Sequence, residues 1–408
     1  MSCWFWDELA RWGTRTALCD EAGEELSFSQ LALAADRFAQ RLGPDRQLVL
    51  IKTGNSIAAV VAFIACLRGR HPAILTSETG ASRIIETFQP NIIVDGTGEI
   101  SRHSDVTHVM HPDLAILLST SGSTGAAKLV RLSHEAVHAN AEAIAQYLDL
   151  SDQDVPITTL PITYSYGLSV LTSHLLAGGR SVLTDRSVVE PEFWALFQKH
   201  RVTSIAGVPY TYELLDASGF RARDLTSLRS MTQAGGRLDA GLRSIFSEWA
   251  KARGIRFFVM YGQTEATARI AYLPPDLQDT FGDCIGRAIP GGRLALEDMA
   301  GNPVLPGEAG ELVFKGPNVM MGYASTPADL ATGRELTVLR TGDVGEEAAP
   351  GIFRIVGRLS RFSKIAGLRI SLDEIEQRLG AHDMRAIVSG DDEAIAVCLE
   401  REDLCATA

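Results

Sequence analysis

A loop rich in serine, threonine and glycine has the composition of a phosphate-binding segment. It covers residues 117–130, LLSTSGSTGAAKLV, between a buried strand pattern and a helix pattern that starts at Ser133. Backbone N–H groups at small residues can converge on an anion, hydroxyls add donors, and Lys128 adds a positive charge. The loop is not of the Walker type, because Ala127 precedes the lysine and Leu129 follows it. We interpret it as a phosphate loop and not as a flexible linker.

A second polar segment follows a predicted buried strand. Residues 255–260 are apolar enough for such a strand, and Tyr261-Gly262-Gln263-Thr264-Glu265 comes directly after them. Open α/β sheets bind their ligands at the carboxyl ends of the strands. The sequence therefore predicts a ligand site at this segment.

A short metal-binding motif offers a different function. The stretch from His134 to His138, HEAVH, matches the zinc-protease helix, with two histidines four residues apart on one face. It lies at the start of the predicted helix after the phosphate loop. No GxxH, which would supply a third zinc-binding histidine, follows His138. A zinc hydrolase is therefore kept as a remote alternative, and the match is interpreted as accidental.

Charge and composition exclude several classes of protein. The chain has 408 residues with a net charge of -12 and a pI near 5.3, which disfavours a nucleic-acid surface and favours small-molecule chemistry. Its six cysteines show no CxxC spacing, as expected for reduced thiols in the cytoplasm. The longest apolar run, residues 57–67, is too short to span a membrane.

Helix and strand patterns alternate as far as residue 260, which predicts a layered, mostly parallel α/β architecture. The clearest helix start is Ser27 with Gln30, a capping box, and Gly43 is placed to end that helix. The predicted helices cover residues 28–42, 57–67, 134–148, 167–177, 191–200 and 238–253. The predicted strands cover residues 48–52, 73–75, 92–94, 157–160, 181–184, 203–206 and 255–260.

The pattern changes from about residue 284 to short strands, turns and glycines, which predicts a small β-rich subdomain over 284–357. We predict a large N-terminal domain, 1–357, that includes this subdomain, followed by a partial α+β C-terminal lobe over 358–408. In that lobe a capping box at 371–374 should open a helix that ends at Gly380, before strands at 386–388 and 394–399.

Seven stretches of the chain carry a further signal. They are STSGSTGAAK at 119–128, LPITYSYGL at 160–168, QAGGRL at 233–238, MYGQTEA at 260–266, GELVFKGPNVMMGY at 310–323, RTGDVG at 340–345 and GRLSRFSKIAGLRISLDEIE at 357–376. In this order they resemble the adenylate-forming (AMP-binding) superfamily of acyl-CoA synthetases, adenylation domains and beetle luciferase. The resemblance implies an ATP- and Mg²⁺-dependent acid-thiol ligase. Such an enzyme joins a small carboxylic acid to AMP, releases pyrophosphate, and passes the acyl group to coenzyme A or to the phosphopantetheine of an acyl carrier protein.

The resemblance also implies roles for individual residues. Thr264 would contact the α-phosphate, Glu265 would hold Mg²⁺, and Lys128 would complete the catalytic set. Tyr261 would lie against adenine, while Asp343 and Arg358 would bind the ribose. The implied ATP-binding residues are Thr120, Ser121, Gly122, Ser123, Thr124, Gly125, Lys128, Gly235, Gly236, Tyr261, Gly262, Gln263, Thr264, Asp343 and Arg358.

An acyl pocket is implied at the centre of the chain. Its expected lining is Tyr164, Tyr166, Val208, Pro209 and Gly235. Tyr164 stands where many acyl-CoA synthetases have a histidine, and either tyrosine is also compatible with a core position. Amino acid adenylation domains usually carry an aspartate here for the substrate ammonium, and residues 160–170 contain none. An α-amino acid substrate is therefore disfavoured.

The chain departs from the family pattern in three places. Ala127 and Leu129 replace a proline and a glycine that commonly flank the loop lysine, and Ser360 stands where many members have a hinge aspartate. No stretch after Asp391 resembles the family's C-terminal glycine-lysine pair, whose lysine reaches the reacting groups. We therefore expect an adenylation step impaired in a truncated chain. The alternatives are a chain completed by a partner and a non-catalytic binder of nucleotide or acyl-adenylate.

Overall fold

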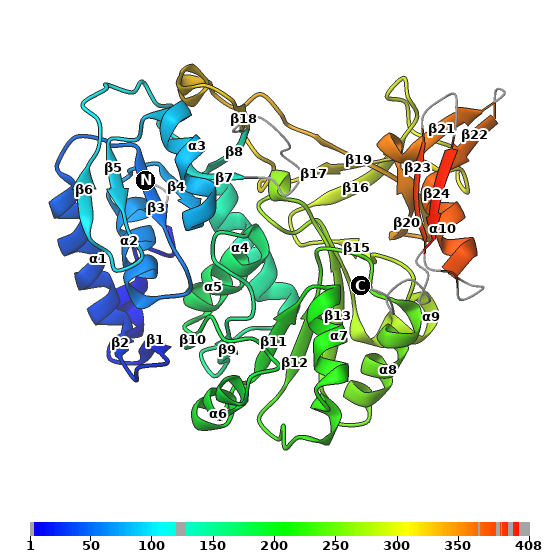
Figure 1. The fold of residues 1–408 in the computed structure, drawn as a ribbon, viewed down its shortest axis with the longest axis horizontal. Coiled ribbons are helices and arrows are strands. Elements are labelled where there is room, and N and C mark those ends of the chain that lie inside the picture. The colour runs from blue at the N-terminus through cyan, green and yellow to red at the C-terminus, as the bar shows by residue number, and fades with distance from the viewer. Residues whose placement is uncertain are drawn as a thin grey trace, which may run out of the picture. The chain divides into compact units, whose positions relative to one another are not determined.

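A computed structural model describes residues 4–119, 128–365, 368–380, 384, 386–390 and 395–399 (Figure 1). The chain forms two compact units. The larger comprises the residues up to Gly282 together with Ala288–Arg293 and Lys315–Leu339, and the smaller comprises Asp283–Arg287, Leu294–Phe314 and the residues from Arg340 on. The predicted domain boundary near residue 357 stays a prediction. In the described part of the chain no helix is both long and apolar enough to cross a membrane.

One sheet of the larger unit orders its strands β18-β8-β7-β4-β3-β5-β6. The four central strands, β7, β4, β3 and β5, run parallel to one another, whereas β8, β18 and β6 are antiparallel to their neighbours. Their bounds are β3 Val49–Lys52, β4 Ala73–Thr76, β5 Ile92–Val94, β6 Ile100–Arg102, β7 Leu114–Ser119, β8 Leu129–Ser133 and β18 Gly322–Ala324.

The second sheet of this unit has the order β15-β14-β13-β12-β11-β9-β10-β1-β2. Its central strands, from β13 to β1, are parallel. Their bounds are β1 Thr16–Asp20, β2 Glu25–Ser27, β9 Pro156–Ile157, β10 Ser181–Leu183, β11 Ser204–Gly207, β12 Ser230–Gln233, β13 Arg256–Tyr261, β14 Ala271–Leu273 and β15 Arg287–Ala288. The predicted class, α/β with layered and mostly parallel sheets, is confirmed.

Helices lie between the strands in sequence, as the alternating pattern predicted. They are α1 Phe28–Leu42, α2 Ile57–Arg68, α3 Glu78–Phe88, α4 His134–Leu148, α5 Ser165–Ala177, α6 Pro191–His200, α7 Pro209–Ala217, α8 Ala240–Lys251 and α9 Gln278–Phe281. The capping box predicted for α1 is present, because Ser27 Oγ accepts from the N–H of Gln30 while the Gln30 side chain accepts from the N–H of Ser27. The α1 prediction was therefore correct at both ends.

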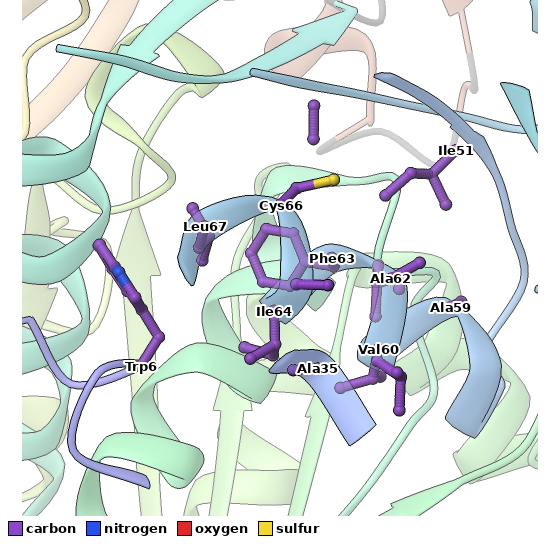
Figure 2. Packing of buried hydrophobic residues seen from close by; sticks show 14 of the residues in the cluster. Trp6, Ala35, Ile51, Ala59, Val60, Ala62, Phe63, Ile64, Cys66 and Leu67 are labelled. Carbon is purple, nitrogen blue, oxygen red and sulfur yellow. The ribbon is translucent and has the colours of Figure 1, made fainter. Parts of the chain in front are cut away.

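Helix α2 forms the centre of the largest core cluster. Phe63, Ile64 and Leu67 are fully buried, and Figure 2 shows them among side chains that include Trp6 and Ile51. Burial of such a side chain is worth about 1.5–3 kcal/mol relative to leaving it in water. Because α2 is apolar around its whole circumference, it belongs inside the protein and not on its surface.

The predicted strand over 157–160 is wrong beyond Ile157. Strand β9 ends there, and the hydroxyls of the next two residues bond to a residue just after β10 and to a residue of β11. Thr158 Oγ1 donates to the carbonyl of Thr184 at 2.7 Å, and Thr159 Oγ1 donates to the carbonyl of Ala206. Threonines are common in strands, so sequence alone did not reveal this early end.

The smaller unit is rich in strands, as predicted for the chain after residue 284. One sheet has the order β16-β17-β19-β20, and two antiparallel ribbons, β21-β22 and β23-β24, accompany helix α10. The bounds are β16 Arg293–Glu297, β17 Gly310–Lys315, β19 Leu339–Ala349, β20 Ile352–Arg358, β21 Phe362–Ile365, β22 Leu368–Ser371, α10 Leu372–Gly380, β23 Ala386–Gly390 and β24 Ile395–Leu399. The predicted helix that ends at Gly380 is present.

A buried histidine near the start of β4 should make stability depend on pH. His71 is 3% exposed, and its Nδ1 accepts the N–H of Gln47 at 3.0 Å. Burial, aided by the charge of Arg46, lowers the pKa of His71 from 6.5 to about 4. Between these values the unfolded chain binds a proton that the folded chain does not. The free energy of unfolding should therefore fall by about 2 kcal/mol between about pH 7 and about pH 5.

Urea denaturation of the wild type and of a His71→Gln variant at both pH values measures this contribution. The variant should lose stability less steeply on acidification, because it has no imidazole to protonate at this position. The same pH dependence in both proteins would show that another group is responsible.

Candidate active site

The predicted phosphate loop connects two antiparallel strands. Ser119 at the end of β7 pairs with Leu129 at the start of β8, so the loop closes a hairpin. Strand β8 lies between the loop and α4, which begins at His134 as predicted, and this strand was not predicted from the sequence. The predicted ligands Thr120, Ser121, Gly122, Ser123, Thr124 and Gly125 lie outside the described residues.

Lys128 and Glu265, predicted from separate motifs, are brought together by a tyrosine of β18. Lys128 Nζ lies 3.5 Å from the ring centroid of Tyr323, and the hydroxyl of Tyr323 donates to Oε1 of Glu265 at 2.9 Å. Burial and the Glu265 carboxylate raise the pKa of Tyr323 well above its usual range, so the phenol keeps its proton. The pairing of Tyr323 with Val130 of β8 fixes this arrangement next to the loop.

The segment around Thr264 and Glu265 is anchored on two sides. Thr264 Oγ1 lies 3.2 Å from Ser165 Oγ at the start of α5, and the carbonyl of Glu265 accepts from the N–H of Met320 at 2.8 Å. Thr267 Oγ1 donates to the carbonyl of Asn318 at 2.8 Å. These bonds hold the half-buried carboxylate of Glu265 in one place, as a preorganised site requires.

Gly262 allows the same segment to turn back closely on itself. A Cβ at this position would lie 1.7 Å from the carbonyl oxygen of Ala268, which no side chain can tolerate. Thr267 and Ala268 have φ values of 55° and 109°, a region that residues other than glycine rarely adopt. The family motif thus needs glycine here for packing. Close by, Gln263 Nε2 donates to the hydroxyl of Tyr261 at 3.2 Å.

Four of the five predicted acyl-pocket residues lie close together. A Cβ on Gly235 would lie 2.6 Å from Tyr164 Oη and 3.0 Å from Val208 Cγ1, and Gly235 has a φ of 81°. A Cβ on Gly236 would lie 3.1 Å from Cγ of Pro209. The absence of side chains at both glycines therefore lets the backbone approach these residues.

The fifth predicted residue, Tyr166, is 2% exposed. Its hydroxyl donates to the carbonyl of Thr232 at 2.9 Å, and its ring meets that of Tyr164 edge-on with centroids 6.3 Å apart. Tyr166 is thus a core residue that supports Tyr164, and its contact with an acyl group stays a prediction.

The predicted ribose ligands form a pair in the smaller unit. Asp343 of β19 is directly opposite Arg358 of β20, and Arg358 Nε donates to Oδ1 of Asp343 at 2.8 Å. Asp343 is 2% exposed, so the charged donor also compensates for the burial of the carboxylate. The predicted hinge residue Ser360 lies in the short 3₁₀ turn Leu359–Arg361, and its role stays a prediction.

Each histidine of the zinc motif makes a structural contact through its Nδ1. His134 is 4% exposed, and its Nδ1 lies 3.0 Å from the carbonyl of Asp113. His138 Nδ1 accepts the N–H of Phe5 at 3.2 Å, and its ring meets that of Trp4 edge-on. In the described part of the chain no three histidine, cysteine, aspartate or glutamate residues are grouped to hold a metal. The histidines instead hold the N-terminal aromatic segment on α4.

Two residues that complete the site were missed from the sequence. Tyr323 links Lys128 to Glu265, and Asn318 Nδ2 donates to the carbonyls of Ala266 and Arg269 at 2.7 and 2.8 Å. Both belong to the motif at 310–323. The motif was quoted from the sequence, so its two polar residues, Asn318 and Tyr323, could have been named as candidates for the site.

Comparisons with known proteins identify relatives of this chain. The family model described as AMP-binding enzyme matches residues 83–324. The chain is 31% identical over 289 residues to a long-chain-fatty-acid–CoA ligase of Salmonella typhimurium, covering 68% of this chain and 51% of that protein. It is 30% identical over 271 residues to a feruloyl-CoA synthase of an Amycolatopsis species, covering 65% and 54%. The chain thus spans about half the length of these two curated relatives.

Solved structures show the same fold. An o-succinylbenzoate-CoA synthetase of Bacillus subtilis in complex with its acyl-adenylate superposes with a TM-score of 0.81 at 24% identity, covering 97% of this chain and 87% of that one. MatB of Rhodopseudomonas palustris with bound ATP gives 0.81 at 22% identity, covering 98% and 89%. The family model matches more than half of the sequence, in the region that holds Lys128, Glu265 and Tyr323. The chain therefore belongs to the AMP-binding enzyme family.

Proposed function

We propose that the chain activates a small carboxylic acid with ATP, forming an acyl-adenylate and releasing pyrophosphate, and passes the acyl group to a thiol. Coenzyme A and the phosphopantetheine of an acyl carrier protein are the two acceptors considered. The observation that carries the proposal is the cluster of Lys128, Tyr323 and Glu265 at the base of the loop hairpin. The names of the two relatives, a feruloyl-CoA synthase and a long-chain-fatty-acid–CoA ligase, support it.

The chemistry explains why these residues are needed. A carboxylate that attacks the α-phosphorus is repelled by the triphosphate, so positive charge must be in place before the reaction. Lys128 supplies one such charge at the loop. Glu265 accepts one hydrogen bond through Oε1, which leaves the other oxygen of a half-buried carboxylate for a hard cation. When bound there, Mg²⁺ would neutralise phosphate charge. Thr264 has its hydroxyl at the same turn for a phosphate oxygen.

The tyrosine between them has a positioning role. Its protonated hydroxyl fixes the Glu265 carboxylate, and its ring attracts the Lys128 ammonium. The two opposite charges are thereby held near each other without forming a direct ion pair, so that both remain available to a nucleotide.

Pyrophosphate release tests the proposal. The chain is incubated with ATP and Mg²⁺ and a panel of aliphatic, hydroxy and aryl carboxylic acids, with and without coenzyme A. We expect release that depends on the acid for at least one class. ATP binding without release for any acid would contradict the proposed activity and would instead support a non-catalytic nucleotide binder.

A further inference from the structure

An arginine beside the predicted acyl pocket is buried without an anionic partner. Arg269 is 2% exposed and directly follows the two residues with positive φ, Thr267 and Ala268. Asn318 Nδ2 holds this turn by donating to the carbonyls of Ala266 and Arg269 at 2.7 and 2.8 Å. Backbone strain of this kind costs about 1–3 kcal/mol per residue and is maintained only where the surroundings enforce it. The strained turn at Thr267 and Ala268 thus places the Arg269 side chain in the interior of the larger unit.

Arg131, another fully buried arginine of the larger unit, has the partners that a buried guanidinium normally has. Arg131 forms an ion pair with Glu335 and donates to the carbonyls of Tyr323 and Thr332. Among the described residues, by contrast, no carboxylate lies within 4.0 Å of the Arg269 guanidinium, and its Nε has no hydrogen-bond partner. Buried arginines are almost always paired, because an isolated charge is costly to remove from water.

The guanidinium lies over an aromatic ring instead. Its carbon lies 4.0 Å from the ring centroid of Tyr166. Burial raises the pKa values of Tyr147, Tyr164 and Tyr166, and the charge of Arg269 acts in the opposite direction on each, aided at Tyr147 by a hydrogen bond that the guanidinium donates. Tyr164 is the residue whose hydroxyl reaches Gly235. The cation therefore lies next to two tyrosines of the predicted acyl pocket, Tyr164 and Tyr166.

We propose that Arg269 is a specificity-determining residue that binds a second carboxylate, at the end of the substrate opposite the reacting one. The substrate class would then be small dicarboxylic acids, of which one carboxylate is activated and the other neutralises the buried guanidinium. Arginine suits this role, because its planar fork can donate two parallel hydrogen bonds to a carboxylate. This inference rests on the proposed function and names the substrate class of the same site.

Binding of stable acyl-adenylate analogues tests the inference without requiring turnover. Acyl sulfamoyl adenosines are prepared in pairs of equal chain length, one ending in a carboxylate and one in a methyl group, from succinyl and butanoyl to adipoyl and hexanoyl. Isothermal titration calorimetry then gives their affinities. We expect at least one carboxylate-ended analogue to bind about 100-fold more tightly than its methyl-ended partner, because it alone pairs the buried charge.

Variants of Arg269 assign the preference to this residue. Arg269→Met replaces the guanidinium with an unbranched, uncharged side chain and should remove the preference, while Arg269→Lys should retain part of it. Thermal unfolding and ATP binding of each variant report whether the fold and the nucleotide site persist. If Arg269→Met fails to fold, the wild-type preference between paired analogues still tests the substrate class, and Arg269→Lys tests the residue.

The possible failures are distinguishable. Methyl-ended analogues that bind as well as carboxylate-ended ones at every chain length would overturn the dicarboxylate inference and leave the proposed activity standing. A carboxylate preference that survives in folded Arg269→Met would also overturn it. A wild-type chain that binds neither ATP nor any analogue would refute the proposed function itself, and the inference with it.

Discussion

Replacing Glu265 with glutamine should lower acid-dependent pyrophosphate release by roughly 10²–10³-fold, the range seen when one preorganised group that stabilises transition-state charge is removed. Glutamine has almost the same shape, and its amide oxygen can still accept the hydrogen bond that Tyr323 donates at 2.9 Å. It has no negative charge with which to hold Mg²⁺. The loss should therefore arise from weaker metal binding and not from a rearranged site.

A magnesium titration of initial rates separates these possibilities. The variant should need a higher Mg²⁺ concentration for half-maximal release, while its thermal unfolding should match that of the wild type. Glu135→Gln is the matched control, because Glu135 forms an exposed ion pair with Arg334 on the same unit, and such pairs are worth little. Unchanged release by Glu265→Gln would remove this carboxylate from the proposed machinery.

Replacing Gly262 with alanine should strongly disturb the backbone of the proposed site. In Gly262→Ala the added carbon would lie 1.7 Å from the Ala268 carbonyl oxygen, so the turn through Thr267 and Ala268 has to move. That turn already has two unfavourable φ values, and overpacking costs about 1–3 kcal/mol or more. We expect a loss of stability of about 3 kcal/mol, together with the loss of most activity, because Thr264 and Glu265 lie inside the turn.

Urea denaturation and pyrophosphate release measure the two effects. Gly96→Ala is the control, since no atom lies within 4 Å of a Cβ at that position and the residue has no positive φ. It should change neither stability nor rate. Wild-type behaviour of Gly262→Ala would show that the turn relaxes at little cost and that its close packing is not required.

Elements with local signals could be predicted from the sequence. The capping box at Ser27 and Gln30 predicted the start of α1 and Gly43 predicted its end. The pattern after Ser133 predicted both ends of α4, Ser133 being an N-cap whose hydroxyl accepts from the N–H of Ala136. Helix α3, Glu78–Phe88, was missed because Thr79-Gly80 in its first turn is unfavourable for a helix. Helix α7, Pro209–Ala217, was also missed, because Val208 and Pro209 were considered only as pocket residues.

The site was only partly predictable for a different reason. Lys128 and Glu265 each belong to a local motif, so their participation could be expected. Their connection depends on the pairing of β8 with β18, and a single sequence contains no signal for strand partners so far apart. Arg269 is a similar case. Arg269 directly follows the motif at 260–266 and the next two residues. Its burial, however, results from the turn that Asn318 stabilises by two hydrogen bonds.

The pairing of β8 with β18 also has a consequence for how the protein is made. Arg131 and Tyr323, which bond across this pair, are 192 positions apart in the chain, so a ribosome completes β8 long before β18 exists. Until then one edge of β8 has no partner although all five of its residues are buried in the native fold. Exposed edges of this kind promote association between chains. The step that completes the Lys128–Tyr323–Glu265 cluster is thus also the one that ends a period of aggregation risk during synthesis.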